Sequence, residues 1–304
     1  MKFKYQGGLT KIVASKIGEK NKKKFIKFIE KKLSTLTSIK SDNQIQLDVV
    51  SFSSSHDFYE QVLSILSFLR YLGTPDSWTV YSDGSHTAEQ INFLKVGFEF
   101  VQVRINEWKD TVQLSSCCKD TLIPYKTCLF DYAENMPLGK KLFCYLNHEI
   151  KKPTLFLDSD IIFYRKATVM EMILREKVNG WYLPDEGWGT LDSRYKNSNI
   201  AKSYQPNSGF FLLNQELTRV EKGMNFLKSL NLKYEYFSEQ TVIYILFECN
   251  NFMPLDPRMF ILNSEDQFDF SYLYSRDKMA VRHYTGPVRH KMWQKDWKWH
   301  LSLS

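Results

Sequence analysis

The sequence predicts an α/β fold in which a mostly parallel central sheet is flanked by helices, and three observations support this prediction. Short apolar segments with strand-like composition alternate with longer segments whose apolar residues recur at helical spacing. Polar residues follow several of the apolar runs directly, as they do where α/β proteins bind ligands at the carboxyl ends of parallel strands. The sequence has no internal repeat and no low-complexity linker, so we expect one domain built in two halves.

In the first half of the domain, predicted strands alternate with predicted helices. Residues 47–53 form an apolar run that ends in serine, which is typical of a buried strand. The next segment is apolar at helical spacing up to Leu72, after which Gly73 and Pro75 predict the end of a helix. The expected order is strand 47–53, helix 57–72, strand 78–81, helix 88–96 and strand 98–103. Because strands joined through helices pair in parallel, this order predicts a parallel sheet covered by helices.

The rest of the chain has a more mixed pattern. Two weaker helical patterns precede an apolar strand that ends at Asp158. Ser238 stands before the last long helical pattern and is a favoured N-cap residue. The further elements that we expect are helices over 122–133 and 139–147, a loop over 185–206, a strand over 207–213, helices over 217–230 and 239–249, and a strand over 279–284. An aromatic, basic tail closes the chain.

The most informative stretch is Thr154–Phe163, in which two carboxylates interrupt an apolar run. In an extended backbone Asp158 and Asp160 would project to the same side, with Ser159 turned away. Two adjacent carboxylates at the end of a buried strand repel each other and are costly to desolvate. A hard divalent cation bound to both removes this cost. The alternative is a strand followed by an ordinary turn with two solvated aspartates.

The net charge of +7 is distributed unevenly along the chain. Residues 1–40 hold 12 Lys and 2 Glu, whereas the remainder holds 29 basic and 32 acidic residues. The body is close to neutral and has no zinc finger, RNA-recognition motif or basic stripe, so no nucleic-acid partner is expected. The basic segment carries Phe25, Phe28 and Leu33 at roughly helical spacing. Such a helix either lies on an anionic membrane surface or docks its apolar stripe on the main domain.

The cysteines and the hydropathy indicate in which cellular compartment the protein lies. The five cysteines are Cys117, Cys118, Cys128, Cys144 and Cys249, and they include no C-x-x-C pair that would indicate a zinc site. An odd, scattered set is typical of reduced thiols in a cytoplasmic protein. No apolar run reaches the roughly 18 residues that a transmembrane helix needs. We therefore expect a cytoplasmic protein. Peripheral contact with the inner membrane face would use residues 1–40 and the tail tryptophans Trp293, Trp297 and Trp299.

Five short motifs follow one another along the chain: residues 141–145, Leu157–Asp160, Asn207–Asn214, Glu239-Gln240 and His283–Gly286. Together they resemble glycosyltransferase family 8, the retaining, glycogenin-like and galactosyltransferase-like group. Leu157–Asp160 is similar to the family's D-x-D, and Asn207–Asn214 is similar to its N-S-G segment. Glu239-Gln240 stands where the family has an acidic residue followed by Gln, and His283–Gly286 is similar to its late H-x-x-G element. Residues 141–145 resemble the family's Lys-containing helix before the D-x-D. The resemblance covers roughly residues 45–300.

The resemblance implies the GT-A fold, a Rossmann-like fold of nucleotide-diphospho-sugar transferases, and it implies the roles of individual residues. Asp158, Asp160 and His283 would bind the metal, Mn²⁺ with Mg²⁺ as the alternative. Residues that would bind the donor, a nucleotide sugar such as a UDP-hexose, are Lys141, Asp158, Ser159, Asn207, Ser208, Gly209 and Gly286. Glu239, Gln240 and Asp185 would act in catalysis. Ser51, Ser53 and Asp83 are further candidates for the nucleotide, because they follow the first two predicted strands.

The tail departs from the family's usual pattern, H-x-x-G-x-x-K-P-W. Lys291 and Trp293 each fall two residues late, and Met292 replaces the proline. Either Arg289 or Lys291 would therefore be the cation that binds the diphosphate. We favour Lys291, because it keeps its spacing to Trp293.

The expected protein thus has a basic N-terminal segment, residues 1–44, and one GT-A domain, residues 45–304. The nucleotide-binding half would end near residue 160, and loops over 104–125 and 185–206 would form the acceptor pocket. The expected activity is metal-dependent transfer of a hexose, with retention, to the hydroxyl of a glycan, a lipid-linked molecule or a protein.

Two alternatives to this activity remain. The first is a catalytically silent scaffold that binds nucleotide sugars with the same fold. The second is a sugar nucleotidyltransferase, but such enzymes carry a Gly-rich, basic loop that Ser51–His56 lacks.

Overall fold

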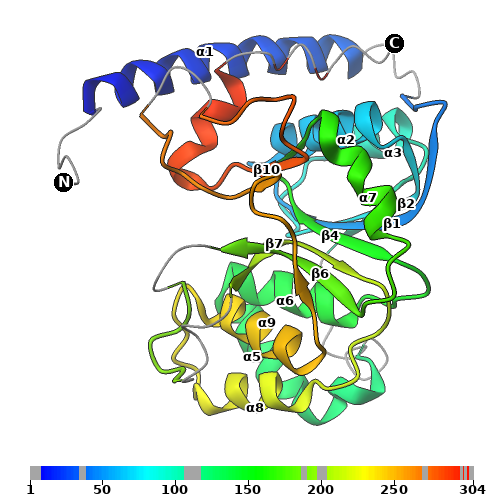
Figure 1. Cartoon of the computed structure of the whole chain (residues 1–304), viewed down its shortest axis with the longest axis vertical. Helices are drawn as coiled ribbons and strands as arrows, with labels where there is room; N and C mark the ends of the chain where they lie inside the picture. Colours follow the sequence, from blue (N-terminus) through cyan, green and yellow to red (C-terminus); the bar gives the residue numbers. More distant parts are fainter. Residues whose placement is uncertain are drawn as a thin grey trace.

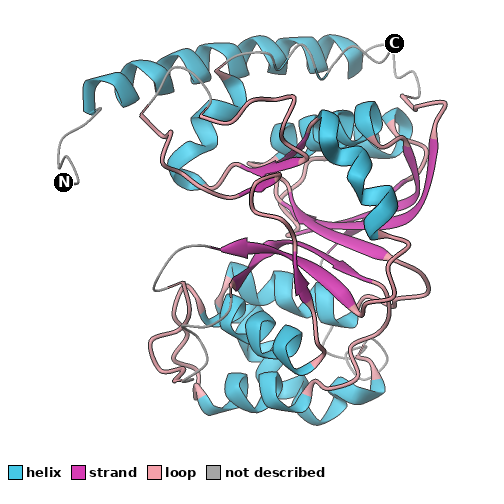
Figure 2. Ribbon diagram, in the orientation of Figure 1, coloured by secondary structure: helices cyan, strands magenta, loops and turns pink. Residues whose placement is uncertain are grey.

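The computed structural model describes residues 8–33, 39–105, 118–185, 190–196, 204–268, 273–294, 297 and 300. This part of the chain forms three layers, with a central sheet between two groups of helices (Figures 1 and 2). The predicted α/β architecture, a mostly parallel sheet flanked by helices, is confirmed.

The central sheet has seven strands. In order across the sheet they are β3 (Val101–Ile105), β2 (Thr74–Ser82), β1 (Gln44–Ser53), β4 (Thr154–Asp158), β7 (Gln205–Leu213), β6 (Gly180–Asp185) and β8 (Met253–Pro254). The first four strands are parallel, but β7 is antiparallel to both β4 and β6. Because Leu157 on β4 pairs with Phe210 on β7, this reversal brings Gly209 beside the carboxyl end of β4.

A second, three-stranded sheet brings the C-terminal part of the chain to the same place. It contains β5 (Ile161–Phe163), β10 (Val281–His283) and β9 (Phe260–Ile261), with β10 in the middle. His283 pairs with Ile161 in antiparallel register, and the N–H of Tyr284 donates to the carbonyl of Asp160 at 3.0 Å. The second sheet thus fixes His283 next to the carboxylate motif.

Helices cover both faces of the central sheet (Figure 1). One face carries α2 (Phe58–Tyr71), α3 (Ala88–Gly97) and α7 (Met170–Ile173), and the other carries α5 (Lys126–Asn135), α6 (Pro137–Asn147), α8 (Glu221–Ser229) and α9 (Ser238–Cys249). The described part of the chain also contains the 3₁₀ helices η1 (Asp120–Tyr125), η2 (Arg165–Val169) and η4 (Gly286–Trp293). Alternate residues of β7 enter the two cores, with Phe210 and Leu212 on one side and Phe211 and Leu213 on the other.

The N-terminal helix α1 (Gly8–Leu33) packs along the edge of the molecule against η4 (Figure 1). Phe25 is fully buried, and its ring centroid lies 5.0 Å from that of Trp293 and 5.5 Å from that of Trp297. A side chain at Gly18 would place its Cβ 2.6 Å from the carbonyl oxygen of His290, so glycine permits this close approach. The apolar stripe of the helix is therefore docked on the domain. Among the described residues, no helix has the length and apolar composition to cross a bilayer.

Most predicted elements are confirmed, and the differences have local causes. β2 begins at Thr74, so Gly73 makes the turn alone, with φ of +101° that favours glycine. Part of the predicted loop over 185–206 lies outside the described residues, but β6 before it was not predicted. Ser238 is the first residue of α9 and does not cap it; its hydroxyl instead donates to Asp192 at 2.6 Å.

Candidate active site

A cavity of about 830 Å³ opens where β4, β7 and β10 meet the start of α9. Its inner wall is polar and includes Lys141, Asn207, Ser208, Glu239 and Gln240. The cavity lies at the carboxyl end of β4, which is the edge where open α/β sheets bind ligands. Most of the residues that the sequence singled out therefore gather around one space, although they come from distant parts of the chain.

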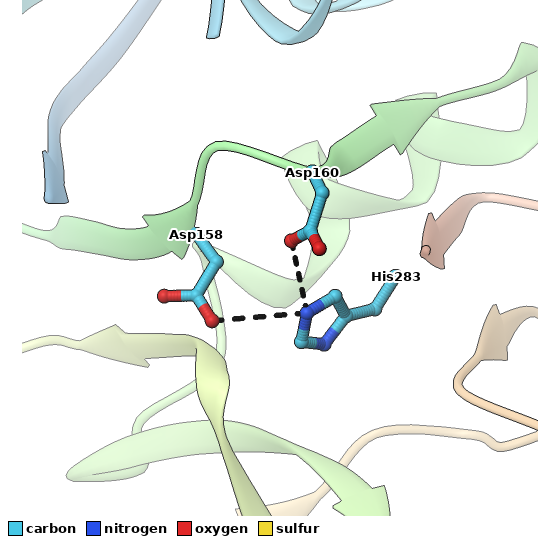
Figure 3. Close-up of side chains that lie close together, drawn as sticks. All are labelled: Asp158, Asp160 and His283. Carbon is cyan, nitrogen blue, oxygen red and sulfur yellow. Dashed lines mark ion pairs between the residues drawn. The ribbon is translucent and has the colours of Figure 1, made fainter. Parts of the chain in front are cut away.

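Asp158, Asp160 and His283 form the most concentrated group of potential metal ligands in this cavity (Figure 3). The Nε2 atom of His283 lies 3.7 Å from Oδ2 of Asp158 and 3.1 Å from Oδ1 of Asp160. Asp158 ends β4, and Ser159 and Asp160 form a turn before β5, so the motif is not the extended strand that we predicted. The turn still aims both carboxylates at the imidazole.

Asn207 orients the imidazole. Its Oδ1 accepts the backbone N–H of Gly209 at 2.9 Å and lies 2.9 Å from Nδ1 of His283. Because this oxygen is an acceptor, Nδ1 of His283 is the donor, and a neutral ring then presents the lone pair of Nε2 to the two carboxylates. This second contact is typical of histidines that bind metals.

The three side chains fit a divalent cation. Their ligand atoms all lie within 4.8 Å of one another, and two carboxylate oxygens with one imidazole suit Mn²⁺ or Mg²⁺. Gly209 leaves this space open: a Cβ there would lie 2.4 Å from Cε1 of His283 and 2.6 Å from Oδ2 of Asp158. The sequence predicted the three ligands and Gly209, and the structure brings them together.

The two buried ligands have opposite pKa shifts. Burial opposes the charged form of Asp160, but the positive charges of His283 and Arg289 outweigh it and lower its pKa to about 2. Burial also opposes the charged form of His283, but Asp160 and Asp158 together raise its pKa. The carboxylate of Asp160 therefore stays ionised and available to a cation.

Lys141 links the metal-ligand group to α9. Its Nζ lies 3.1 Å from Oδ1 of Asp158 and 3.4 Å from Oε1 of Glu239, and the side chain is buried. Burial would lower the pKa of Lys141, but the two carboxylates raise it above its usual value. Glu239 also accepts the hydroxyl of Ser208 at 2.6 Å. The ammonium group thus bridges two carboxylates at the inner wall.

Gln240 and Asp185 also line the cavity. Nε2 of Gln240 donates to the carbonyl of Thr190 at 2.8 Å and lies 3.5 Å from Oδ2 of Asp185. Gly286 also lines the cavity, at the start of η4, with no heavy atom near the position of a Cβ. All three of these predicted residues therefore line the cavity.

Arg289, and not Lys291, faces the cavity from η4. The guanidinium of Arg289 donates to Asp160 at 2.5 Å and to Asp57 at 3.0 Å. Lys291 is fully buried on another side of η4, where its Nζ donates to the carbonyl of Asp266 at 2.8 Å. Our preference for Lys291, which was based on its spacing to Trp293, is not supported by this geometry.

Five other predicted residues lie outside the cavity lining: Gly209, which faces His283, and Ser51, Ser53, Asp83 and Ser159. Ser51 is fully buried and accepts the indole N–H of Trp78 at 3.0 Å, so its hydroxyl forms a hydrogen bond within the core. Asp83 accepts the backbone N–H of Ser85 at 2.9 Å, a contact that is typical of an ordinary turn. Ser53 and Ser159 are buried.

Several residues that line the cavity were not predicted from the sequence. They include Tyr236, Phe237, Asn263, Glu265 and Tyr274, which lie in loops outside the motifs. Tyr236 is 71% exposed, so one face of its ring is open to a ligand. Tyrosine and glutamate in a loop carry no local signal of function, and only their position around the cavity identifies them.

No protein-family model matches this chain, and no curated protein matches it. Among solved structures, the galactosyltransferase LgtC, in complex with donor and acceptor sugar analogues, is similar with a TM-score of 0.53 at 14% identity, over 79% of this chain and 87% of that one. The bifunctional glycosyltransferase WbbM has a TM-score of 0.53 at 14% identity, over 88% of this chain and 52% of that one. The glycosyltransferase GlyE from Streptococcus pneumoniae TIGR4 has a TM-score of 0.50 at 12% identity, over 84% of this chain and 62% of that one.

These similarities establish the fold. The chain has the GT-A fold of the glycosyltransferases that it resembles, as the order of its motifs predicted.

Proposed function

We propose that this protein is a metal-dependent glycosyltransferase that moves a hexose from a nucleotide diphosphate sugar, UDP-linked, to an acceptor hydroxyl with retention of configuration. The observation that carries the proposal is the group Asp158, Asp160 and His283 in the wall of a polar cavity, at the ligand-binding edge of a GT-A fold. A fold of this kind has been solved with donor and acceptor sugar analogues in LgtC, which supports a sugar donor here.

The proposed site provides positive charge where the diphosphate leaves. A divalent cation held by Asp158, Asp160 and His283 would neutralise the charge that builds on the diphosphate oxygens. Arg289, which lines the cavity and donates to Asp160, would add a second positive charge. Its guanidinium can exchange Asp160 for phosphate oxygens, because its side chain remains 37% exposed. We therefore assign the role of diphosphate-binding cation to Arg289, where the sequence pattern left Arg289 and Lys291 as alternatives.

The inner wall is suited to hold the donor sugar. Asn207, Ser208 and Gln240 offer amide and hydroxyl groups to the sugar hydroxyls. Burial raises the pKa of Glu239, and Lys141 opposes this shift and holds the carboxylate in place, since its ammonium lies between Glu239 and Asp158. These residues position the donor through hydrogen bonds and do not exchange protons with it.

Retention through a double displacement would need a nucleophile, and the described residues of this wall offer none that is available. Both oxygens of Glu239 are engaged or buried against Ser208 and Lys141, and the residue is 1% exposed. Gln240 is an amide and a weak nucleophile. We therefore favour a front-face reaction in which the acceptor hydroxyl attacks on the side from which the diphosphate departs. The leaving diphosphate would accept the proton of that hydroxyl.

The acceptor would enter at the mouth of the cavity. Asp185, Tyr236 and Tyr274 line this part, and tyrosine rings stack on the apolar faces of sugars. Much of the two expected acceptor loops, residues 106–117, 186–189 and 197–203, lies outside the described residues. We leave the acceptor as a glycan, a lipid-linked molecule or a protein.

We place the enzyme in the cytoplasm as part of this proposal. Cys128 and Cys249 are free thiols. Unpaired thiols agree with a reducing compartment. The fifth cysteine, Cys117, lies outside the described residues.

The donor and the metal can be tested together by thermal unfolding. We expect UDP with Mn²⁺ to stabilise the protein by about 2.7 kcal/mol when UDP is about 100-fold above its Kd, which raises the unfolding midpoint by a few degrees. UDP without Mn²⁺ should give a much smaller shift, and GDP, CMP and dTDP should give little. A shift of the unfolding midpoint with another nucleotide would show that the donor carries that nucleotide and not UDP. The absence of any shift would favour the catalytically silent scaffold. Proton NMR of the transferred anomeric centre then tests retention.

The two tail cations can be separated by matched substitutions. Arg289→Gln should keep the fold and lower turnover about 100-fold, because it removes a charge at the leaving group. Lys291→Gln should instead lower the free energy of unfolding by about 1–3 kcal/mol, because it disturbs buried contacts with Asp266. Turnover is measured below the unfolding midpoint of both variants. Normal turnover in Arg289→Gln, with loss only in Lys291→Gln, would restore the sequence-based assignment.

A further inference from the structure

The helix α1 presents two different faces, and the second is not explained by sugar transfer. Ala14, Gly18, Phe25 and Ile29 are buried and follow helical spacing, so they form the inner face that packs on η4 and α2. The opposite side is exposed. We call it the outer face of α1, and it consists of Leu9, Ile12, Val13, Lys16, Lys20, Lys23, Lys24 and Lys27.

The outer face combines apolar and positive side chains in one stripe. Leu9, Ile12 and Val13 are 81%, 53% and 48% exposed at its N-terminal end. The five lysines continue the same side of the helix over the next three turns, because residues 16, 20, 23 and 27 follow one another at intervals of three or four. Among the described residues of α1, the acidic ones are Glu19 and Glu30. The stripe is therefore strongly positive next to an aliphatic patch.

The inner face holds this stripe in a fixed orientation. Phe25 packs between Trp293 and Trp297, Lys22 pairs with the buried Glu60, and Asn21 donates to the carbonyl of Gln294 at 2.8 Å. Figure 1 shows α1 along the outer edge of the molecule, with the rest of the chain on one side of it. A 26-residue helix is about 39 Å long, so the face is an extended, presented surface.

We propose that the outer face of α1 binds the surface of an anionic lipid bilayer, with the helix lying parallel to the membrane. The lysines would contact acidic head groups, and Leu9, Ile12 and Val13 would enter the boundary between head groups and acyl chains. A polynucleotide would also attract the lysines, but it offers nothing to three exposed aliphatic side chains. The combination on one face favours the bilayer.

The contacting residues differ from those that the sequence indicated. Phe25, Trp293 and Trp297 are buried, and Phe28 packs against the core, so these aromatic residues hold the helix to the domain. Trp299 lies outside the described residues. The docked helix instead turns aliphatic residues outward, at its other end.

Sedimentation of the full chain with lipid vesicles tests the proposal, and it needs neither metal nor nucleotide sugar. The wild type should sediment with vesicles that contain phosphatidylglycerol in phosphatidylcholine and not with phosphatidylcholine alone. Each lysine near an anionic surface contributes about fivefold to binding, so replacing Lys16, Lys20, Lys23, Lys24 and Lys27 by Gln should weaken it at least about 100-fold. Replacing Leu9, Ile12 and Val13 by Ser should also weaken it at least about tenfold.

Two control variants match these changes in charge and exposed apolar surface. The first replaces five exposed lysines elsewhere, Lys95, Lys177, Lys222, Lys228 and Lys233, by Gln. The second replaces the exposed Val96, Met172 and Met253 by Ser. Both should bind vesicles as the wild type does, and circular dichroism verifies the fold of every variant.

Three outcomes would overturn the proposal. The wild type would fail to sediment with anionic vesicles, or the lysine control would lose binding as fully as the outer-face variant. Alternatively, the wild type would bind a polynucleotide such as poly(U) at least as tightly as it binds anionic vesicles, and the variant at Leu9, Ile12 and Val13 would bind vesicles as the wild type does. The last result would identify the outer face as a general polyanion site.

Discussion

Asp160→Asn should lower sugar transfer at least about 1,000-fold while the protein remains folded. Asp160 offers one of the two carboxylates of the candidate metal site, and its Oδ1 lies 3.1 Å from Nε2 of His283. Asparagine has nearly the same shape but no charge, so it weakens both the metal site and the contact with Arg289. Removing charge stabilisation from a developing anion typically costs about 2.7–4 kcal/mol, and the loss of a metal adds to this.

The effect must appear in metal binding as well as in turnover. Electron paramagnetic resonance of free Mn²⁺, titrated with protein and UDP, should show weaker binding by Asp160→Asn than by the wild type. Asp76→Asn is a matched control, because Asp76 also forms an ion pair, with Lys152, but on the surface and away from the cavity. It should leave turnover and Mn²⁺ binding unchanged. Equal Mn²⁺ affinity in wild type and Asp160→Asn would disprove the metal assignment.

Gly209→Ala should disable the same site without altering a ligand. The added Cβ would lie 2.4 Å from Cε1 of His283, 2.6 Å from Oδ2 of Asp158 and 2.9 Å from Oδ1 of Asn207. Two metal ligands and the side chain that orients the imidazole would have to move. We expect Mn²⁺ affinity to fall about 10- to 100-fold, as for changes that displace metal ligands, and turnover to fall at least about 100-fold.

Gly97→Ala is the control for this substitution. A Cβ at Gly97 would meet only the ring of Phe93, at 3.6–3.8 Å, which is ordinary van der Waals contact. Overpacking at Gly209 should cost about 1–3 kcal/mol of stability, so turnover is compared below the unfolding midpoint of each variant. If Gly209→Ala bound Mn²⁺ as tightly as Gly97→Ala does, the space beside His283 would not be a metal site.

Local patterns were sufficient for most of the elements of this fold. Apolar runs predicted β1, β4 and β7, and helical spacing predicted α2 and α9, because these segments are long and bury one side or both. The short strands β5, β8 and β9 were not predicted. Each has two or three residues, so it shows no period of its own and forms only when a partner strand is present.

The sequence itself determined the α/β class and the identity of the three candidate metal ligands, because both depend on residue types in a fixed order. Only the tertiary structure decided how the ligands meet: β10 pairs with β5, which places His283 beside Asp160 from 123 positions away in the chain. Only the tertiary structure distinguished Arg289, which lines the cavity, from Lys291, which is buried outside its lining. Residues two apart on a 3₁₀ helix, which has about three residues per turn, point in different directions. Likewise, the docking of α1 decided that Phe25 is buried and Leu9 exposed, because spacing defines a helical face but not its partner.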